Sequence, residues 1–127
     1  MAAKRILLVE DDRAVRFMLT LVLRGESYVV DSVESAVAAL SYLARERYDL
    51  VISDWRLPDG DGLEIADEAA ELGAKTIVMS GDLFQIPSEV RNRHEHKFLM
   101  KPMRPSELVN AVHCSIHGGR RVVQRKR

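Results

Sequence analysis

Short apolar runs alternate with longer segments of helical period along this chain, five times over. The runs are rich in β-branched and aliphatic residues, and we expect strands at residues 6–9, 28–30, 50–53, 76–79 and 98–100. Strands that are apolar throughout are typical of a parallel sheet, because crossover helices bury both of its faces. The alternation therefore predicts an α/β fold built on a doubly wound, five-stranded parallel sheet.

The segments between the strands predict helices with recognisable ends. Apolar residues within 15–22 fall at the i, i+3, i+4, i+7 spacing, and Gly25 is a suitable C-terminal stop. The fourth helix is predicted to be short, because residues 88–94 are mostly polar. Start signals for the other three helices stand at Ser35, Gly62 and Pro105.

Composition limits the fold to a single ordinary domain. A chain of 127 residues buries a real core and leaves no room for a second folded module. The formal net charge is zero, so wholesale attraction to nucleic acid or anionic lipid is not expected. Cys114 is the only cysteine and cannot form an intrachain disulfide, and no window approaches the roughly 18 apolar residues that span a bilayer. These features predict a cytoplasmic protein without a membrane segment.

Polar residues follow four of the predicted strands. Glu10 and Asp11 come after the first strand, and the third, fourth and fifth strands are followed by Asp54, Ser80 and Lys101. In doubly wound sheets the ligand crevice lies at the carboxyl ends of the strands, where the strand order reverses. If the order is 2-1-3-4-5, the first and third strands are neighbours, and Asp11 and Asp54 can share one cation.

This set of side chains suits phosphoryl transfer onto an aspartate. Clustered carboxylates repel one another unless a cation lies among them, and oxygen-only ligands favour a hard ion such as Mg²⁺. An ionised Asp54 can attack phosphorus to give an acyl phosphate. The metal, the Lys101 ammonium and the Ser80 hydroxyl would stabilise the charge on the transferring oxygens. Gly81 has no side chain and would leave space beside Ser80 for the phosphoryl group.

Four motifs resemble those of the receiver domain of two-component response regulators, and the match covers about residues 4–117. The motifs are Val-Glu-Asp-Asp at 9–12, Ser-Asp-Trp-Arg-Leu-Pro-Asp-Gly-Asp-Gly at 53–62, Met-Ser-Gly at 79–81 and Leu-Met-Lys-Pro at 99–102. Each motif alone is weak, whereas the set in this order and spacing is specific. The resemblance implies a flavodoxin-like fold with helices on both faces of the sheet. It also implies a phosphorylation-dependent switch of a two-component or phosphorelay system.

The resemblance assigns roles around the acidic cluster. Asp54 would accept a phosphoryl group from a histidine kinase, a histidine phosphotransfer protein or a small donor such as acetyl phosphate. Mg²⁺ would be bound by Asp11, Asp54 and the backbone carbonyl of Arg56, with Glu10 acting mainly through water. Arg56 and Asp82 would border the route of the water that hydrolyses the acyl phosphate. Their opposite charges predict a contact that slows dephosphorylation.

The resemblance also assigns the switch. The bond between Lys101 and Pro102 would be cis and would hold Lys101 in place. After phosphorylation, Ser80 would move toward the phosphoryl group and Phe98 would turn inward. A receiver catalyses only its own phosphorylation and dephosphorylation, so the chain is not expected to be an enzyme in any other sense.

Two features depart from the family pattern and concern the output of the switch. His-Glu-His-Lys at 94–97 replaces the small Gly-Ala step that usually precedes the last strand, and the fourth helix is short. Both predict an unusual output face. No output module follows in the sequence, so we expect a stand-alone receiver that signals through a protein partner or passes phosphate onward. The basic segment 118–127 is expected to be a disordered tail, with a docking or nucleic-acid arm as the alternative.

Structural roles would explain several of these residues one at a time. Carboxylates at 10–12 suit the positive end of a helix dipole, a lone Lys101 is usually solvated, and a lone Ser80 is usually a turn residue. Phe98 alone would be assigned to core packing. Asp54 directly after an apolar strand is harder to explain in this way. The case for a functional site therefore rests on all of these residues together.

Two further patterns suggest metal sites that the sequence does not complete. Asp-Gly-Asp-Gly at 59–62 resembles the start of a calcium loop, but Leu63 stands where an oxygen ligand is needed, so we expect a turn before the third helix. The four histidines form no four-ligand zinc set, and we expect them at the surface, at positions 94, 96, 113 and 117.

Other classes of function remain as alternatives. A flavodoxin-like cofactor binder would share the fold, but the carboxylates at 10–12 would repel a phosphate unless a metal intervened. A phosphatase with an aspartyl nucleophile usually carries a second aspartate two residues later, and Arg56 stands there. A receiver-shaped scaffold that is never phosphorylated is the third alternative.

Overall fold

Five parallel strands form the central sheet of the computed structural model, which describes residues 2–93 and 95–118. The order in the sheet is β2-β1-β3-β6-β7, the predicted 2-1-3-4-5 arrangement of the five long strands. A small antiparallel pair, β4 and β5, follows β3 and was not predicted. The bounds are Arg5–Val9 (β1), Val29–Val33 (β2), Leu50–Asp54 (β3), Arg56–Leu57 (β4), Gly60–Asp61 (β5), Lys75–Ser80 (β6) and Lys97–Met100 (β7).

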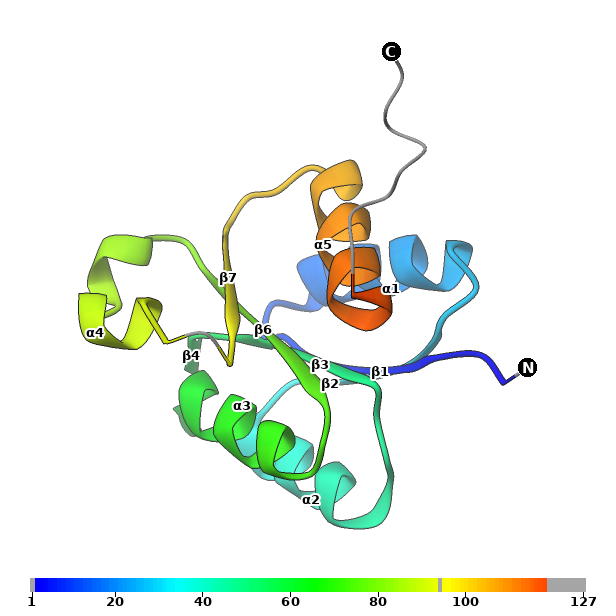
Figure 1. Cartoon of the computed structure of the whole chain (residues 1–127), viewed down its shortest axis with the longest axis horizontal. Coiled ribbons are helices and arrows are strands. Elements are labelled where there is room, and N and C mark those ends of the chain that lie inside the picture. The colour runs from blue at the N-terminus through cyan, green and yellow to red at the C-terminus, as the bar shows by residue number, and fades with distance from the viewer. Residues whose placement is uncertain (1, 94, 119–127) are drawn as a thin grey trace.

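Helices cover both faces of the sheet, as the sequence predicts. In Figure 1, α1 and α5 lie on one face, and α2 and α3 lie on the other. The bounds are Arg13–Gly25 (α1), Ala36–Arg45 (α2), Gly62–Glu71 (α3), Ser88–Arg91 (α4) and Pro105–His117 (α5). The fourth helix is even shorter than predicted, and a 3₁₀ turn at Leu83–Gln85 (η1) precedes it. Within the described part of the chain, none of the helices has the length and apolar character that crossing a bilayer requires.

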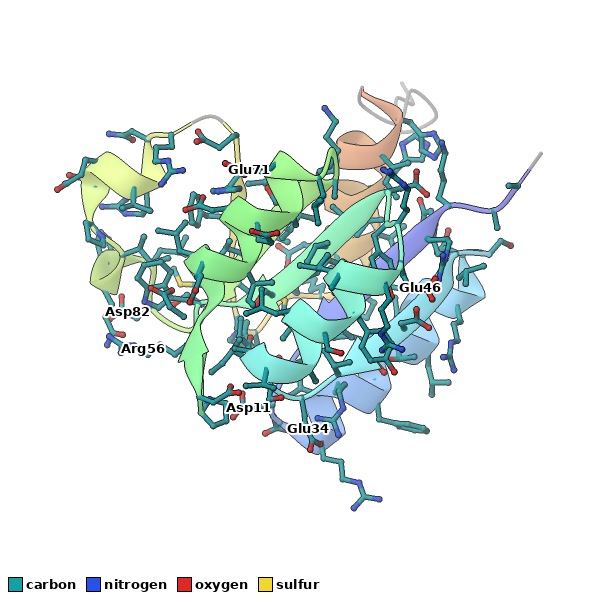
Figure 2. All side chains as sticks on the ribbon, turned by 90° about the horizontal axis from the view of Figure 1, so that it is seen from below. Asp11, Glu34, Glu46, Arg56, Glu71 and Asp82 are labelled. Carbon is teal, nitrogen blue, oxygen red and sulfur yellow. The ribbon has the colours of Figure 1, made fainter. Side chains whose placement is uncertain are left out.

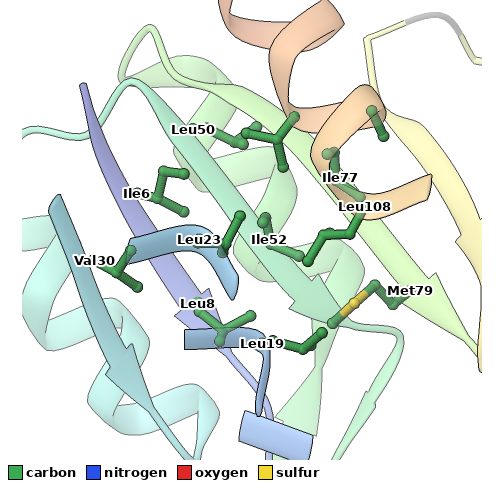
Figure 3. Close-up of a cluster of buried hydrophobic side chains, with 12 residues drawn as sticks. Ile6, Leu8, Leu19, Leu23, Val30, Leu50, Ile52, Ile77, Met79 and Leu108 are labelled. Atoms are coloured by element: carbon green, nitrogen blue, oxygen red, sulfur yellow. The ribbon is translucent and has the colours of Figure 1, made fainter. Parts of the chain in front are cut away.

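Strands β1, β2 and β3 each contribute side chains to two hydrophobic cores. Along β1, Ile6 and Leu8 point into the core beneath α1 and α5, whereas Leu7 and Val9 point into the core above α2 and α3. All four side chains are fully buried, and each contributes about 1.5 to 3 kcal/mol by leaving water. Figure 3 shows the first core, in which strand residues meet α1 and α5. The apolar runs are thus the strands of a sheet covered on both sides.

Strand β2 is longer than the prediction of 28–30 and ends at Val33. The polar residues Asp31 and Ser32 interrupt the apolar run, which hid the rest of the strand. Asp31 is satisfied in the fold, because it accepts hydrogen bonds from the Tyr48 hydroxyl at 2.6 Å and the Arg5 guanidinium at 3.4 Å. An edge strand tolerates such residues because one of its sides has no neighbouring strand.

The segment 59–62 was predicted to be a turn before the third helix; only Asp59 lies in the turn, Gly60 and Asp61 form β5, and Gly62 begins α3. Asp59 accepts hydrogen bonds from the first two amides of α2, at 2.7 and 2.9 Å, and these bonds lower the pKa of Asp59 below its ordinary value. Asp61 caps α3 by accepting from the amide of Leu63 at 2.8 Å. A Cβ atom on Gly62 would lie 1.7 Å from the carbonyl oxygen of Asp54. Only glycine therefore allows α3 to begin against the end of β3.

Candidate functional site

The sheet order brings three carboxylates together at the carboxyl edge of the sheet. Glu10 is completely buried, Asp54 is 5% exposed, and Asp11 lies at the surface. One carboxylate oxygen from each lies within 4.8 Å of the other two. In Figure 2, Asp11 is seen along the same edge of the molecule as Arg56 and Asp82. The three acids predicted from the sequence thus surround a space that fits one cation.

Lys101 joins the acidic cluster from the far side of β6. Its ammonium donates hydrogen bonds to Glu10 Oε1 at 2.8 Å and to Asp54 Oδ1 at 2.9 Å. Burial alone would lower the pKa of Lys101, but its bonds to the two carboxylates outweigh burial and raise that pKa above the ordinary value. Lys101 therefore stays cationic. The peptide bond that follows it, to Pro102, is cis, as the resemblance implies.

Burial dominates the acid–base behaviour of Asp54. Removal of this carboxyl from water, followed by its hydrogen bond with Glu10, raises the pKa of Asp54 to about 8, although Lys101 acts in the opposite direction. The second oxygen of Glu10 accepts from the amide of Asp12 at 3.0 Å, which fixes this carboxylate at the turn. Without a metal, the cluster therefore holds a proton at neutral pH that a bound cation would displace.

The donor set fits a hard divalent ion. All three side chains offer carboxylate oxygens, which Mg²⁺ prefers over nitrogen or sulfur ligands. Two of them are buried, so their mutual repulsion is poorly screened by solvent. Arg56 lines the adjoining cavity, and Glu10, Asp11 and Asp54 are the residues that would hold the ion.

A cavity of about 290 Å³ opens beside these carboxylates. It is large enough for a phosphoryl group and several waters, since a water occupies roughly 30 Å³. A Cβ atom on Gly81 would meet no atom within 4 Å, so this position faces open space. The residues that line the cavity include Asp11, Asp54, Arg56, Ser80, Gly81, Asp82 and Lys101.

The Ser80 hydroxyl is held by its own loop. Its Oγ donates to the carbonyl oxygen of Asp82 and accepts from the amide of Asp82, each at 3.1 Å. Arg56 and Asp82 line the same cavity, but within the described residues no ion pair joins their side chains, so the predicted charge contact is not formed. Both side chains are exposed, and Asp82 Oδ1 accepts a hydrogen bond from the amide of Phe84 at 2.9 Å. Slow dephosphorylation stays a prediction, which acyl phosphate decay in Arg56→Ala would test.

Phe98 is half-buried on β7 and belongs to neither hydrophobic core. Its ring lines a broad surface groove and meets the His96 ring edge to face, with 6.5 Å between centroids and 86° between planes. The alternative of simple core packing is therefore wrong.

The prediction of a surface position is wrong for His96, and residue 94 lies outside the described residues. The His96 ring is buried between β6 and α3, with Nδ1 2.5 Å from Thr76 Oγ1 and Nε2 2.7 Å from Asp67 Oδ1. Asp67 also accepts from Arg93 at 2.9 Å. The polar Thr76 in an otherwise apolar strand was the one sequence signal of this network. Nothing in the sequence spacing indicated that α3 supplies the other partner.

Comparison with protein families identifies the family to which this chain belongs. The model of the response regulator receiver domain matches residues 6–113. The chain belongs to the response regulator receiver domain family. This receiver domain is 30% identical over 116 residues to the DNA-binding response regulator MtrA of Mycolicibacterium paratuberculosis. The match covers 89% of this chain and 51% of that protein.

A second curated relative is the transcriptional regulatory protein ResD of Bacillus subtilis, which is 29% identical over 114 residues. That match covers 85% of this chain and 46% of ResD. The chain thus spans about half the length of these curated relatives.

Solved structures agree with the fold. A CheY-like receiver domain protein from Methanospirillum hungatei superposes with a TM-score of 0.83 at 29% identity, covering 92% of this chain and 96% of that one. The receiver domain of sensor histidine kinase PA1611 from Pseudomonas aeruginosa gives a TM-score of 0.79 at 27% identity, over 91% and 99%. The PA1611 structure holds a magnesium ion coordinated in its active-site cleft. The present chain has an acidic cluster of Glu10, Asp11 and Asp54.

Proposed function

We propose that this receiver domain is a switch that accepts a phosphoryl group on Asp54 with the help of Mg²⁺. The observation that carries the proposal is the environment of Asp54. This carboxylate is buried, is hydrogen-bonded to the Lys101 ammonium, and lies with Glu10 and Asp11 around the space for one cation. A carboxylate with only a structural role would not need two further acids beside it.

The chemistry follows from the positions of these groups. A carboxylate oxygen of Asp54 forms the new bond to phosphorus while the bond from phosphorus to the donor atom breaks. The leaving group keeps the electron pair, and an imidazole leaving group also takes up a proton. Lys101, fixed 2.9 Å from Asp54 Oδ1, is placed to stabilise charge on the transferring oxygens. Mg²⁺, when bound, would supply positive charge on the side of Asp11.

The donor is proposed to be a histidine kinase or a histidine phosphotransfer protein, and the downstream partner a protein. An apolar cavity of about 410 Å³ opens beside Lys101, between α1 and the loop after β7, and supports docking of a protein donor next to Asp54. The apolar residues that line it are Val15, Met18, Leu19, Pro102 and Met103. Cytoplasmic location and self-catalysed dephosphorylation remain predictions of the same proposal.

Ser80 and Phe98 are proposed to respond to the phosphoryl group. Ser80 would exchange its two bonds to Asp82 for one to a phosphoryl oxygen, because a charged acceptor makes the stronger hydrogen bond. Phe98 would then turn inward from its half-buried position on β7. A coupling of about 1 to 3 kcal/mol suffices to change partner affinity roughly 5- to 150-fold.

Beryllofluoride, which mimics an acyl phosphate on aspartate, tests the proposal. Trp55 follows Asp54 directly and lines the cavity, so its fluorescence reports on occupancy. We expect a saturable change when wild-type protein receives beryllofluoride and Mg²⁺, and none in Asp54→Ala. A wild-type protein that shows no change would overturn the proposal.

A further inference from the structure

Arg16 contacts the acidic turn and is not among the residues that line the cavity beside Asp54. It stands near the start of α1, and its side chain is only 18% exposed. It lines a separate cavity of about 640 Å³, together with Arg13, Phe17 and Arg24. The family resemblance assigned no role to Arg16, and its α1 position gave no sign of a link to the site.

The guanidinium of Arg16 binds the backbone of the metal-binding turn. Its Nη1 donates to the carbonyl oxygen of Glu10 at 2.8 Å and lies 3.4 Å from the carbonyl oxygen of Asp11. Its Nη2 lies 3.7 Å from Glu34 Oε1, but the Glu34 side chain is 72% exposed, and such a screened pair contributes little. The main contact of this partly buried cation is therefore with the two carbonyls.

These contacts hold the turn from the side that the sheet cannot reach. The amide of Glu10 donates to the carbonyl oxygen of Val33 at 3.0 Å, the last such bond between this chain segment and β2. On the other side, the amide of Asp12 donates to the Glu10 carboxylate. One guanidinium nitrogen, Nη1, supplies the donors to both carbonyls in between, and the planar guanidinium fixes the direction of its N–H bonds.

Helix stability does not explain a cation at this position. Positive side chains near the first turn of a helix oppose the helix dipole, and the first turn of α1 holds no acidic residue to offset them. The guanidinium instead donates to the backbone carbonyls of Glu10 and Asp11, two residues of the acidic cluster.

We infer that Arg16 is a positioning residue for the metal site. It fixes the backbone of Glu10 and Asp11 in the conformation that turns both carboxylates toward Asp54, and it does so without touching the metal space. The inference rests on the proposed function, because the cation is the one required for phosphorylation. Groups that orient metal ligands from behind typically change metal affinity by roughly 10- to 100-fold when removed.

Titration with Mg²⁺, followed by Trp55 fluorescence on the full chain, tests the inference. Arg16→Met should raise the dissociation constant for Mg²⁺ by roughly 10-fold or more. Arg13→Met is the matched control, because it removes the same charge from the same end of α1 while leaving both carbonyl contacts intact. Arg16→Lys keeps the charge but not the planar guanidinium that directs Nη1 at both carbonyls, and its affinity for Mg²⁺ should lie between those of wild type and Arg16→Met.

Hydrogen exchange in the metal-free protein separates positioning from general stability. The Asp12 amide should exchange faster in Arg16→Met than in Arg13→Met. A lower melting temperature with unchanged Mg²⁺ affinity would overturn the inference, as would equal affinities in Arg16→Met and Arg13→Met. If Arg16→Met does not fold, Arg16→Lys decides, and wild-type affinity in that variant overturns the inference.

The two proposals fail in different ways. A wild-type protein that binds no Mg²⁺ and accepts no phosphoryl group overturns both the proposed function and the role of Arg16. A wild-type protein that does both, combined with an Arg16→Met variant that matches Arg13→Met, overturns only the role of Arg16.

Discussion

The ammonium of Lys101 donates a hydrogen bond of 2.9 Å to the carboxylate of Asp54, 47 positions earlier in the chain. Asp54 ends β3 and Lys101 follows β7, and β6 lies between these strands in the sheet. The lysine therefore reaches across one strand to a carboxylate that is almost fully buried. This relationship places a permanent positive charge where a phosphoryl group would gain negative charge.

Replacement of Lys101 by methionine should slow phosphorylation by acetyl phosphate. The side chain keeps a similar length but loses its charge, and removal of one such electrostatic donor typically costs a factor of about 100 or more. The rate is measured at saturating Mg²⁺, so that metal affinity does not contribute. Lys97→Met is the control, since Lys97 is exposed on the preceding strand. Equal rates in the two variants would contradict the assigned role.

Mg²⁺ affinity should increase with pH below about 8. The pKa of Asp54 in the metal-free protein is raised to about 8, first by burial and then by the bond with Glu10, so a cation that binds at lower pH must displace one proton. The dissociation constant should then fall roughly tenfold for each pH unit in this range. Mg²⁺ titrations followed by Trp55 fluorescence at two pH values measure this change in the dissociation constant. A pH-independent constant in wild type would contradict this account of Asp54.

The raised pKa of Asp54 also predicts how the free energy of unfolding of the metal-free protein depends on pH. The pKa of Asp54 in the folded protein is about 8, above its ordinary value of 3.8. The contribution of the protonated carboxyl to the free energy of unfolding is therefore complete below pH 3.8 and is lost as pH rises through 8. Asp54→Asn should flatten this part of the curve of unfolding free energy against pH. Urea unfolding across this window checks it, and parallel curves for the two proteins would argue against a buried, protonated Asp54.

Gly62→Ala should destabilise the domain and disturb the site together. The added Cβ atom would lie 1.7 Å from the carbonyl oxygen of Asp54, so α3 or the end of β3 must shift, at a cost of about 1 to 3 kcal/mol. Gly25→Ala is the control, because a Cβ atom there meets nothing within 4 Å. Urea unfolding measures the free energies of unfolding of the two variants, and Trp55 fluorescence measures their Mg²⁺ affinities. Two variants of equal stability would refute the close approach.

His96→Leu should lower the unfolding free energy by about 1 to 3 kcal/mol. The substitution removes both ring nitrogens and leaves the buried Thr76 hydroxyl without that partner, whereas the half-exposed Asp67 keeps its bond to Arg93. His117→Leu serves as the control, because His117 is exposed at the end of α5. Chemical unfolding measures the difference, and a His96 variant as stable as its control would show that the network contributes nothing.

The arrangement of Asp54, Ser80 and Lys101 could be predicted from the sequence because strand ends depend on local apolar runs. Once the runs define parallel strands, the residues that follow them must share one edge. The cap at Ser35 was likewise local, and the structure confirms it with a 3.2 Å bond from the amide of Ala38. Local signals were sufficient for these elements.

Other features depend on contacts between distant segments and left little trace in the sequence. The burial of His96 requires Asp67 from α3, and the role of Asp59 requires the first amides of α2. Arg16 looks like a solvent-facing helical residue until the end of β1 places the carbonyls of Glu10 and Asp11 beside it. Spacing along one helix or strand cannot reveal a partner on another. The basic segment 119–127 and its expected disorder lie outside the described residues.

Intact mass after incubation with acetyl phosphate and Mg²⁺ tests the central claim most directly. The account predicts that wild-type protein gains one phosphoryl group, that Asp54→Ala gains none, and that omission of Mg²⁺ greatly slows the gain. The mass measurement also separates the switch from a receiver-shaped scaffold that is never phosphorylated. A wild-type mass that does not change, or an equal gain in Asp54→Ala, would contradict the assignment of Asp54 as the phosphoacceptor.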